Sequence, residues 1–286
     1  MLADVTTVVV FPDGPGGGNP APVVLDAAGM TDREMQDVAR ASGHESAFVL
    51  PAPEGSTADL ALRFWVPDHE MEMCGHATVG AVWLLATRGS LPRDHLSIAT
   101  PSGVVEAVVR RDNGSVEVEI SQPPGRVEAL TPEGVDAVLR VLGIGREELA
   151  DRPVVNATTS RTKTLVPVVS EEVLDGLRPD LDGVRAACDA VGSTGLYPYA
   201  VRGHRDLSAR QLPRSSGYPE DPATGIAAAA LLFGALDAGL VDRSDDPVTV
   251  RQGRAMGQPS AMTLRLRLDG DDALGCWLGG RVELQD

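Results

Sequence analysis

The sequence is poor in aromatic residues and in positive charge. Aromatic residues make up 3% of its 286 residues, and 25 Lys and Arg stand against 41 Asp and Glu, which gives a formal net charge of −16. Such a charge repels phosphate groups and argues against nucleic acid or an anionic membrane surface as a partner. So few aromatic rings also make a stacking platform for single-stranded nucleic acid unexpected.

Cysteines and long apolar runs are scarce as well. Three cysteines, Cys74, Cys188 and Cys276, are too few and too scattered for a disulfide framework or a zinc site. No stretch approaches the roughly 18 consecutive apolar residues of a membrane span, and the N-terminal residues lack the basic region of a signal peptide. A hydrophobic content of 43% is enough to form a core. We therefore expect a soluble, cytoplasmic, globular protein.

Runs of branched residues alternate along the chain with helical patterns. A capping box, Thr31 followed by Glu34, marks the start of one helix. Helices are predicted at Thr31–Ser42, Thr78–Thr87, Pro132–Leu142, Glu171–Leu177 and Ile226–Ala238, of which the second and the last are apolar nearly all round and therefore buried. Strands are predicted at Val5–Phe11, Ala47–Leu50, Leu60–Val66, Val104–Arg110, Val116–Ile120, Thr164–Val169, Tyr197–Val201, Met262–Leu268 and Arg281–Leu284.

The chain contains a weak internal repeat at an offset near 147 residues. In this alignment Arg63 falls on Arg210 and Cys74 falls on Asp221. Both halves follow the same order of strands, a proline-containing turn and an all-apolar helix. The fold class predicted is α+β, with two pseudo-symmetric domains, each a sheet wrapped around a buried helix. We place the domains at residues 1–124 and 125–280, with a strand near 281–286 that can return to the first.

Three polar segments are candidates for chemistry. His76 lies in the turn before the first buried helix, where backbone N–H groups can hold a carboxylate or enolate, although a structural histidine fits the same pattern. Asp221 precedes the second buried helix and reads equally well as an N-cap. Glu45 lies between a predicted helix and a buried strand, where burial can raise a carboxyl pKa, although an exposed loop glutamate is the simpler interpretation.

A glycine-rich segment, Gly14–Asn19, follows the first predicted strand. It lacks both the lysine of a P-loop and the GxGxxG spacing, so nucleotide binding is disfavoured. A flexible loop over a pocket is the favoured interpretation.

Several motifs resemble the PhzF-like family, the phenazine-biosynthesis isomerases of the diaminopimelate epimerase-like superfamily. The resemblance covers nearly the whole chain, in order, and the pairing of CGHAT with a downstream DPATG is specific. The motifs are GNPAPVVL at 18–25, HESAFVL at 44–50, LRFWVPDHEMEMCGHATVGA at 62–81, EDPATGIAAA at 220–229 and QGRAMGQPS at 252–260.

The resemblance implies a homodimer and catalysis in a cleft between the domains, on a small-molecule carboxylate, without a metal or organic cofactor. It implies that Glu45 is the catalytic acid/base and that His76 and Asp221 line the same cleft as catalytic residues. Substrate-binding positions implied by the same motifs are Asn19, Ser46, Gly75, Ala77, Thr224, Gly225 and Ile226.

Two positions depart from the family pattern. Ile226 stands where the family commonly has a serine after DPATG, and Gln211 stands where it tends to have an aromatic residue. A site that used the serine hydroxyl would lack that hydrogen bond here, which indicates a different substrate or a changed reaction.

The reaction type implied is allylic isomerisation, in which one carboxylate moves a proton between carbons. Two-thiol racemisation, as in the related epimerases, is disfavoured because the second half offers Asp221 opposite Cys74 in the repeat. The alternatives are a dehydratase or cyclase that begins with the same proton abstraction, and a non-catalytic small-molecule binding protein of the same fold.

Overall fold

In a computed structural model, which describes residues 4–112, 114–216, 218–270 and 272–285, the chain forms two compact units. Unit 1 consists of Met1–Pro12, Gly18–Ser121 and Gly279–Asp286, and unit 2 consists of Asp13–Gly17 and Gln122–Leu278. The chain therefore passes between the units more than once. No helix within the described ranges is long and apolar enough to cross a membrane.

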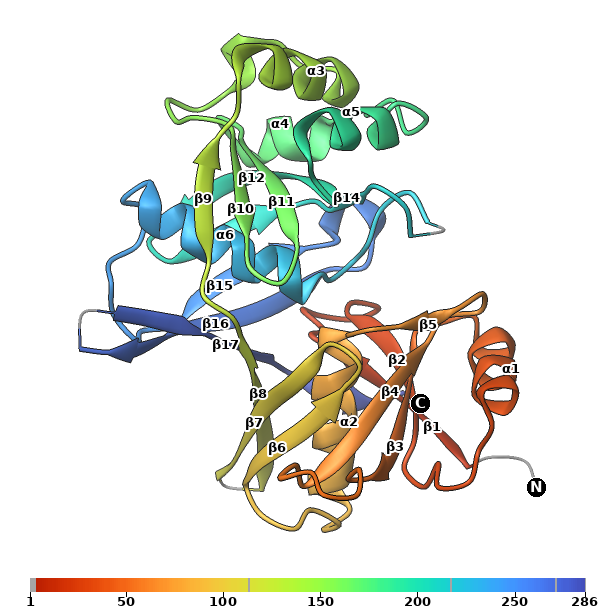
Figure 1. Cartoon of the computed structure of the whole chain (residues 1–286). Coiled ribbons are helices and arrows are strands. Elements are labelled where there is room, and N and C mark those ends of the chain that lie inside the picture. Colours follow the sequence, from red (N-terminus) through yellow and green to blue (C-terminus); the bar gives the residue numbers. More distant parts are fainter. Residues whose placement is uncertain (1–3, 113, 217, 271, 286) are drawn as a thin grey trace. The chain divides into compact units, whose positions relative to one another are not determined.

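Unit 1 is built around a single buried helix, α2 (Gly75–Thr87). Its apolar side chains are buried on all sides of the helix, and it packs against β1, β2 and β3 (Figure 1). The surrounding elements are β1 (Val5–Val10), β2 (Asn19–Val24), α1 (Asp32–Ser42), β3 (Ser46–Pro51), β4 (Leu60–Trp65), β5 (Glu70–Met71), β6 (His95–Thr100), β7 (Gly103–Asp112), β8 (Ser115–Gln122) and β18 (Val282–Leu284).

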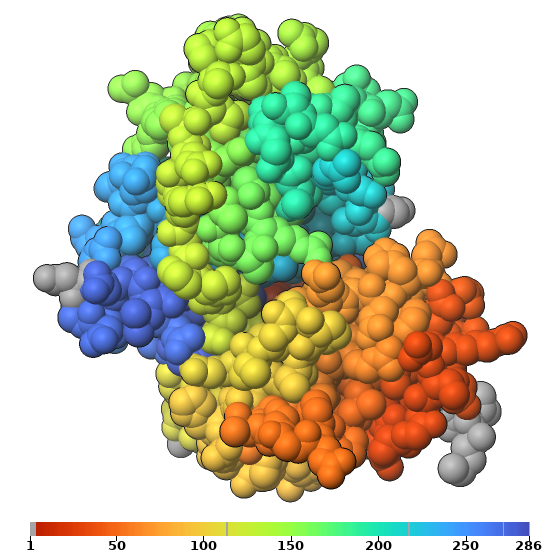
Figure 2. All heavy atoms as spheres, in the orientation of Figure 1, coloured from red at the N-terminus to blue at the C-terminus, as the bar shows by residue number. Residues whose placement is uncertain are grey.

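Unit 2 repeats this design around α6 (Gly225–Asp237), which packs against β10 and β11 (Figure 1). Two further helices, α3 and α5, cover a separate apolar cluster, and α3 lies at the outer surface (Figure 2). The elements are β9 (Arg126–Ala129), α3 (Pro132–Leu142), a 3-10 turn (Arg146–Glu148), β10 (Val155–Thr158), β11 (Thr162–Pro167), α4 (Glu171–Gly176), α5 (Val184–Val191), β12 (Gly195–Gly203), β13 (Asp206–Ala209), β14 (Leu212–Pro213), β15 (Val248–Gln252), a 3-10 turn (Arg254–Met256), β16 (Ser260–Asp269) and β17 (Asp272–Gly280).

Strand pairing confirms the predicted repeat. In unit 1 the pairs β1–β2, β3–β4 and β6–β7 are antiparallel, whereas β2–β3 and β4–β6 are parallel. In unit 2 the pairs β10–β11, β12–β13 and β15–β16 are antiparallel, whereas β11–β12 and β13–β15 are parallel. Both units thus have one pairing order, as expected for two pseudo-symmetric α+β domains.

An arginine–glutamate ion pair also recurs in the two units. Arg63 makes a two-pronged hydrogen bond to Glu70 at 2.6 and 2.8 Å, and Arg210 makes the same contact to Glu220 at 2.9 and 2.8 Å. Each pair joins a strand, or in unit 2 the residue directly after β13, to the segment that leads into the buried helix. The equivalence of Arg63 and Arg210 in the sequence repeat is therefore confirmed.

The predicted match of Cys74 with Asp221 is wrong. Phe64 pairs with Met71, seven positions later, whereas the bridge from Gln211 reaches Asp221, ten positions later. The loop before the helix is therefore longer in unit 2, which shifts the register. Cys74 immediately precedes α2, and the residue in that place before α6 is Thr224.

Candidate active site

Glu45 lies in the short link between α1 and β3. Helix α1 ends at Ser42, and Gly43 closes it in the left-handed conformation with φ 69°. The strand begins at Ser46, which is fully buried, so the chain turns inward at Glu45. The Glu45 side chain is 18% exposed, and it lies between a helix end and a buried strand as the sequence predicts.

Glu45, Cys74 and His76 form one polar cluster in unit 1. The Cys74 thiol donates to Oε2 of Glu45 at 3.2 Å and lies 3.4 Å from Nδ1 of His76. Nδ1 of His76 is 3.5 Å from the same carboxylate oxygen, and the His76 side chain is 5% exposed. His76 thus contacts side chains that can take part in proton transfer.

The start of α2 adds backbone donors beside this cluster. The first N–H groups of a helix have no partner within the helix, and they carry a partial positive charge. In α1, α3 and α4 the side chains of Thr31, Thr131 and Ser170 accept a hydrogen bond from one of these N–H groups, whereas neither α2 nor α6 has a side-chain cap. Gly75 and Ala77, in the first turn of α2, are buried next to His76.

Asp221 is the centre of a second polar cluster, in unit 2. Its Oδ1 accepts from the N–H of Ala223 at 3.3 Å and its Oδ2 accepts from the hydroxyl of Thr224 at 2.5 Å. Nε2 of Gln252 donates to the Asp221 carbonyl at 2.6 Å and to the Thr224 hydroxyl at 3.1 Å. Asp221 therefore rigidifies the turn before α6, although Thr224 rather than Asp221 directly precedes the helix.

Tyr197 contacts this cluster through Gln252. Its hydroxyl donates to Oε1 of Gln252 at 2.8 Å, and complete burial raises its pKa well above the usual value. The hydroxyl therefore stays protonated and fixes the orientation of the Gln252 amide. Gln252 belongs to the QGRAMGQPS motif noted in the sequence, whereas no sequence pattern indicates Tyr197.

The remaining predicted binding residues lie at the starts of strands and helices. The Ser46 hydroxyl donates to the carbonyl of His44 at 3.1 Å and lies 3.3 Å from the hydroxyl of Ser42, so it stabilises the end of α1. Asn19, half-buried, is the first residue of β2 and pairs with Val10. Gly225 and Ile226 begin α6, where Ile226 is half-buried and occupies the place that His76 has in α2.

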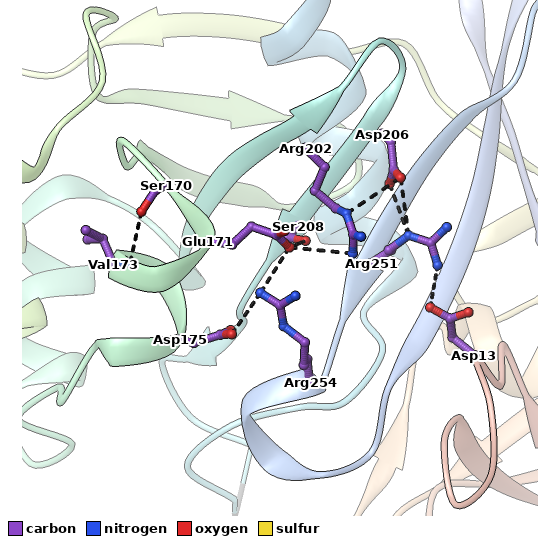
Figure 3. A network of polar contacts seen from close by, with 10 residues as sticks. All are labelled: Asp13, Ser170, Glu171, Val173, Asp175, Arg202, Asp206, Ser208, Arg251 and Arg254. Carbon is purple, nitrogen blue, oxygen red and sulfur yellow. Dashed lines mark hydrogen bonds and ion pairs between the residues drawn. The ribbon is translucent and has the colours of Figure 1, made fainter.

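Asp13, the residue before the glycine-rich segment, is anchored within unit 2. Asp13 accepts from Arg251, which also contacts Asp206 (Figure 3). The N–H of Asp13 donates to the carbonyl of Pro259 at 3.0 Å. Asp13 and Arg251 line a small recess, together with Arg254, which pairs with Glu171 and Asp175. These arginines are neutralised by carboxylates, so the network is structural.

Two-thiol chemistry has no support in the geometry. Burial raises the pKa of Cys188 to about 11 and that of Cys276 to about 12. Both are buried as thiols and lie outside the two clusters. Thr224, the residue equivalent to Cys74, offers a hydroxyl instead of a second thiol.

One cluster has donors that can hold a metal. The ligand atoms of Glu45, Cys74 and His76 all lie within 4.8 Å of one another. Three protein ligands of these types are what a catalytic zinc ion takes.

Comparison with known proteins relates the chain to isomerases. It is 30% identical to the uncharacterized isomerase YddE of Escherichia coli K12, and the match covers 90% of this chain and 88% of that protein. A PhzF-family phenazine biosynthesis protein from Bacillus anthracis has the same fold, with a TM-score of 0.87, 24% identity and coverage of 99% of this chain and 96% of that one. A hydroxyproline epimerase from Agrobacterium vitis is more distant, with a TM-score of 0.62, 15% identity and coverage of 99% and 90%.

The family match spans both clusters. Residues 8–275 match the family of phenazine biosynthesis-like proteins, PhzC-PhzF, and this range contains Glu45, His76 and Asp221. With the epimerase-type fold and isomerase relatives, the match confirms the resemblance noted in the sequence. The chain belongs to the PhzC-PhzF family of phenazine biosynthesis-like proteins.

Proposed function

We propose that this protein is a cofactor-independent isomerase that moves a proton between two carbons of a small unsaturated carboxylate. The observation that carries the proposal is the position of the Glu45 carboxylate, in contact with Cys74 and His76 and beside the uncapped start of α2. A base and an anion-binding backbone are what abstraction of a proton next to a conjugated carboxylate requires.

In this reaction Glu45 removes an allylic proton from one carbon and returns it to another carbon, on the same face of the substrate. The negative charge that develops on the substrate is delocalised into its carboxylate, which the first N–H groups of α2 stabilise. His76 and the Cys74 thiol hold the Glu45 carboxylate in one orientation through the contacts at 3.5 and 3.2 Å. From the family resemblance we keep Asp221 as a residue that orients the same substrate, with the chain acting as a homodimer.

The experiment is a proton-exchange assay in deuterated water, followed by NMR and mass spectrometry. Unsaturated amino and hydroxy acids are offered to the wild type, to Glu45→Gln and to Glu72→Gln, whose carboxylate is exposed near the same turn. For the wild type and Glu72→Gln we expect deuterium incorporation into a product whose mass, apart from the deuterium, equals that of the substrate. For Glu45→Gln we expect a loss of about 100-fold or more, the usual contribution of a general base.

Each rival predicts another result in this assay. A dehydratase gives a product lighter by one water, a binding protein gives chemical-shift changes without deuterium incorporation, and a zinc enzyme loses its exchange activity in a chelator and regains it with zinc. Exchange by Glu45→Gln at the wild-type rate would remove Glu45 from the mechanism.

A further inference from the structure

The donor atoms of Glu45, Cys74 and His76 form a nearly equilateral triangle. Oε2 of Glu45 lies 3.2 Å from Sγ of Cys74 and 3.5 Å from Nδ1 of His76, and the third side, from Sγ to Nδ1, measures 3.4 Å. All three residues belong to unit 1, so the triangle is complete within one unit. Three different kinds of metal ligand therefore converge on one point.

The size of this triangle matches one face of a tetrahedral zinc site. Zinc binds thiolate sulfur at about 2.3 Å and imidazole nitrogen or carboxylate oxygen at about 2.0–2.2 Å, and tetrahedral bond angles then place the donor atoms about 3.3–3.6 Å apart. The measured sides of 3.2, 3.4 and 3.5 Å need to change by no more than about 0.4 Å. The carboxylate is open to water, since the Glu45 side chain is 18% exposed, and an ion can therefore reach the triangle from solvent.

The donor set favours zinc over the harder cations. Thiolate and imidazole suit Zn²⁺, whereas Mg²⁺ and Ca²⁺ take oxygen ligands. A Cys74 thiolate and the Glu45 carboxylate together carry two negative charges, so they neutralise a bound Zn²⁺. This neutrality offsets the cost of placing the ion beside Cys74 and His76, which are 3% and 5% exposed. It also offsets repulsion from the first N–H groups of α2.

The donors are held in place before an ion arrives. The carbonyl of Cys74 accepts from the N–H of Thr78 at 3.0 Å and from the Thr78 hydroxyl at 2.7 Å, which fixes the residue before α2. His76 follows two positions later, in the first turn of the helix. Ser46, next to Glu45, is fully buried at the start of β3. Binding requires only that the Cys74 thiol releases its proton to solvent and that Nδ1 of His76 presents its lone pair.

From this geometry we infer that Glu45, Cys74 and His76 form a binding site for Zn²⁺, and that zinc inhibits the isomerase by occupying its base. A carboxylate bonded to zinc shares its lone pair with the metal and is a poor proton acceptor. Zinc and the substrate proton therefore compete for Glu45. The metal site stands on unit 1 alone, whereas the inhibition rests on the proposed function.

Binding is tested on the full chain after removal of metal ions with a chelator. Zn²⁺ is titrated by calorimetry, and Co²⁺ serves as a coloured substitute that shows thiolate ligation as a near-ultraviolet charge-transfer band. We expect one ion per chain, the charge-transfer band, and a higher melting temperature with zinc. Cys74→Ala should lose the band and bind zinc about 100-fold more weakly or worse, because a ligand itself is removed.

Matched variants separate a ligand from a bystander. His76→Gln and Glu45→Gln should each weaken zinc binding in the same way as Cys74→Ala, so the test does not depend on the stability of one variant. Cys188→Ala removes a buried thiol outside the cluster, and Glu72→Gln removes an exposed carboxylate near the same turn. Both controls should change zinc affinity less than twofold. The site is overturned if the wild type gives no charge-transfer band with cobalt, or if Cys74→Ala keeps it.

The proton-exchange assay gives the readout for inhibition. Zinc at saturation should lower deuterium incorporation by the wild type about tenfold or more, and a chelator should restore it. The residual exchange of Cys74→Ala should change less than twofold at the same zinc concentration. Zinc that fills the site but raises exchange, or leaves it unchanged, overturns the inhibition. The binding readouts are independent of turnover, so they decide the metal site even if the proposed isomerisation is wrong.

Discussion

The thiol of Cys74 donates a hydrogen bond to Oε2 of Glu45, and the two residues come from different elements of unit 1. Glu45 precedes β3, whereas Cys74 precedes α2. In the proposed mechanism the thiol therefore orients the carboxylate base rather than acting as the base itself.

Replacement of Cys74 separates these two roles. In Cys74→Ser a hydroxyl keeps the hydrogen bond to Glu45, so proton exchange should fall less than about tenfold. Cys74→Ala removes the donor and should lower exchange by roughly 10- to 100-fold, the equivalent of one hydrogen bond to a charged group. Rates of deuterium incorporation check this. A loss of three orders of magnitude in Cys74→Ser would assign the chemistry to the thiol.

Gly80 allows α2 to lie close to β1. A Cβ at this position would be 2.7 Å from Cγ2 of Val8 and 3.1 Å from Cγ2 of Val10. Gly80→Ala should therefore destabilise the fold by about 1–3 kcal/mol, the usual cost of overpacking a core. Gly176, in α4, has nothing within 4 Å of the same added atom, and Gly176→Ala should be neutral or slightly stabilising. Urea denaturation distinguishes the two, and equal stabilities would contradict the packing argument.

The two related arginine–glutamate pairs should differ in their contribution to stability. The Arg210 side chain is 9% exposed and also donates to the carbonyls of Leu174 and Leu177, whereas the Arg63 side chain is 27% exposed. Arg210→Met leaves the carboxylate of Glu220 buried and unpaired, which should cost about 3–5 kcal/mol. Arg63→Met should cost clearly less. Thermal unfolding measures both, and a larger loss in Arg63→Met would contradict the burial argument.

Lys163 makes stability depend on pH in the alkaline range. Its pKa is about 8 in the folded protein against 10.5 for an unperturbed lysine, so the unfolded chain binds more protons between these values. Stability from this group therefore increases as pH rises from about 8 to 10.5. Lys163→Met removes the cost of burying the ammonium and should be more stable at pH 7, by roughly 3 kcal/mol at most. This advantage should shrink by pH 10, as denaturation at the two pH values would show.

Side-chain patterns in the sequence predict the buried helices and about half of the strands that the described residues form, yet they miss elements whose signal is not in the side chains. Helix α2 begins at Gly75 rather than Thr78, because the apolar pattern does not report a first turn made of glycine and histidine. Strand β2 contains Pro20 and Pro22, which usually argue against a strand. It is accommodated because β3 pairs only with its last two residues, Val23 and Val24.

The candidate site was predictable where short motifs carry it. Glu45 and His76 are indicated by HESAFVL and CGHAT, and the structure brings them together. Tyr197 was missed because its role depends on the hydrogen bond to Gln252, which lies in another strand far along the chain and which no local pattern reveals.

The last residues of the chain complete a unit that the first residues begin. Strand β18 pairs with β1 through Val282, Glu283 and Leu284, and residues 279–286 belong to unit 1. During synthesis on the ribosome, unit 1 therefore cannot close until the whole of unit 2 has emerged, although N-terminal domains ordinarily fold first. A nascent chain stopped at Ser121 would have an unpaired apolar edge at Val8 and Val10, which makes it a natural client for chaperones.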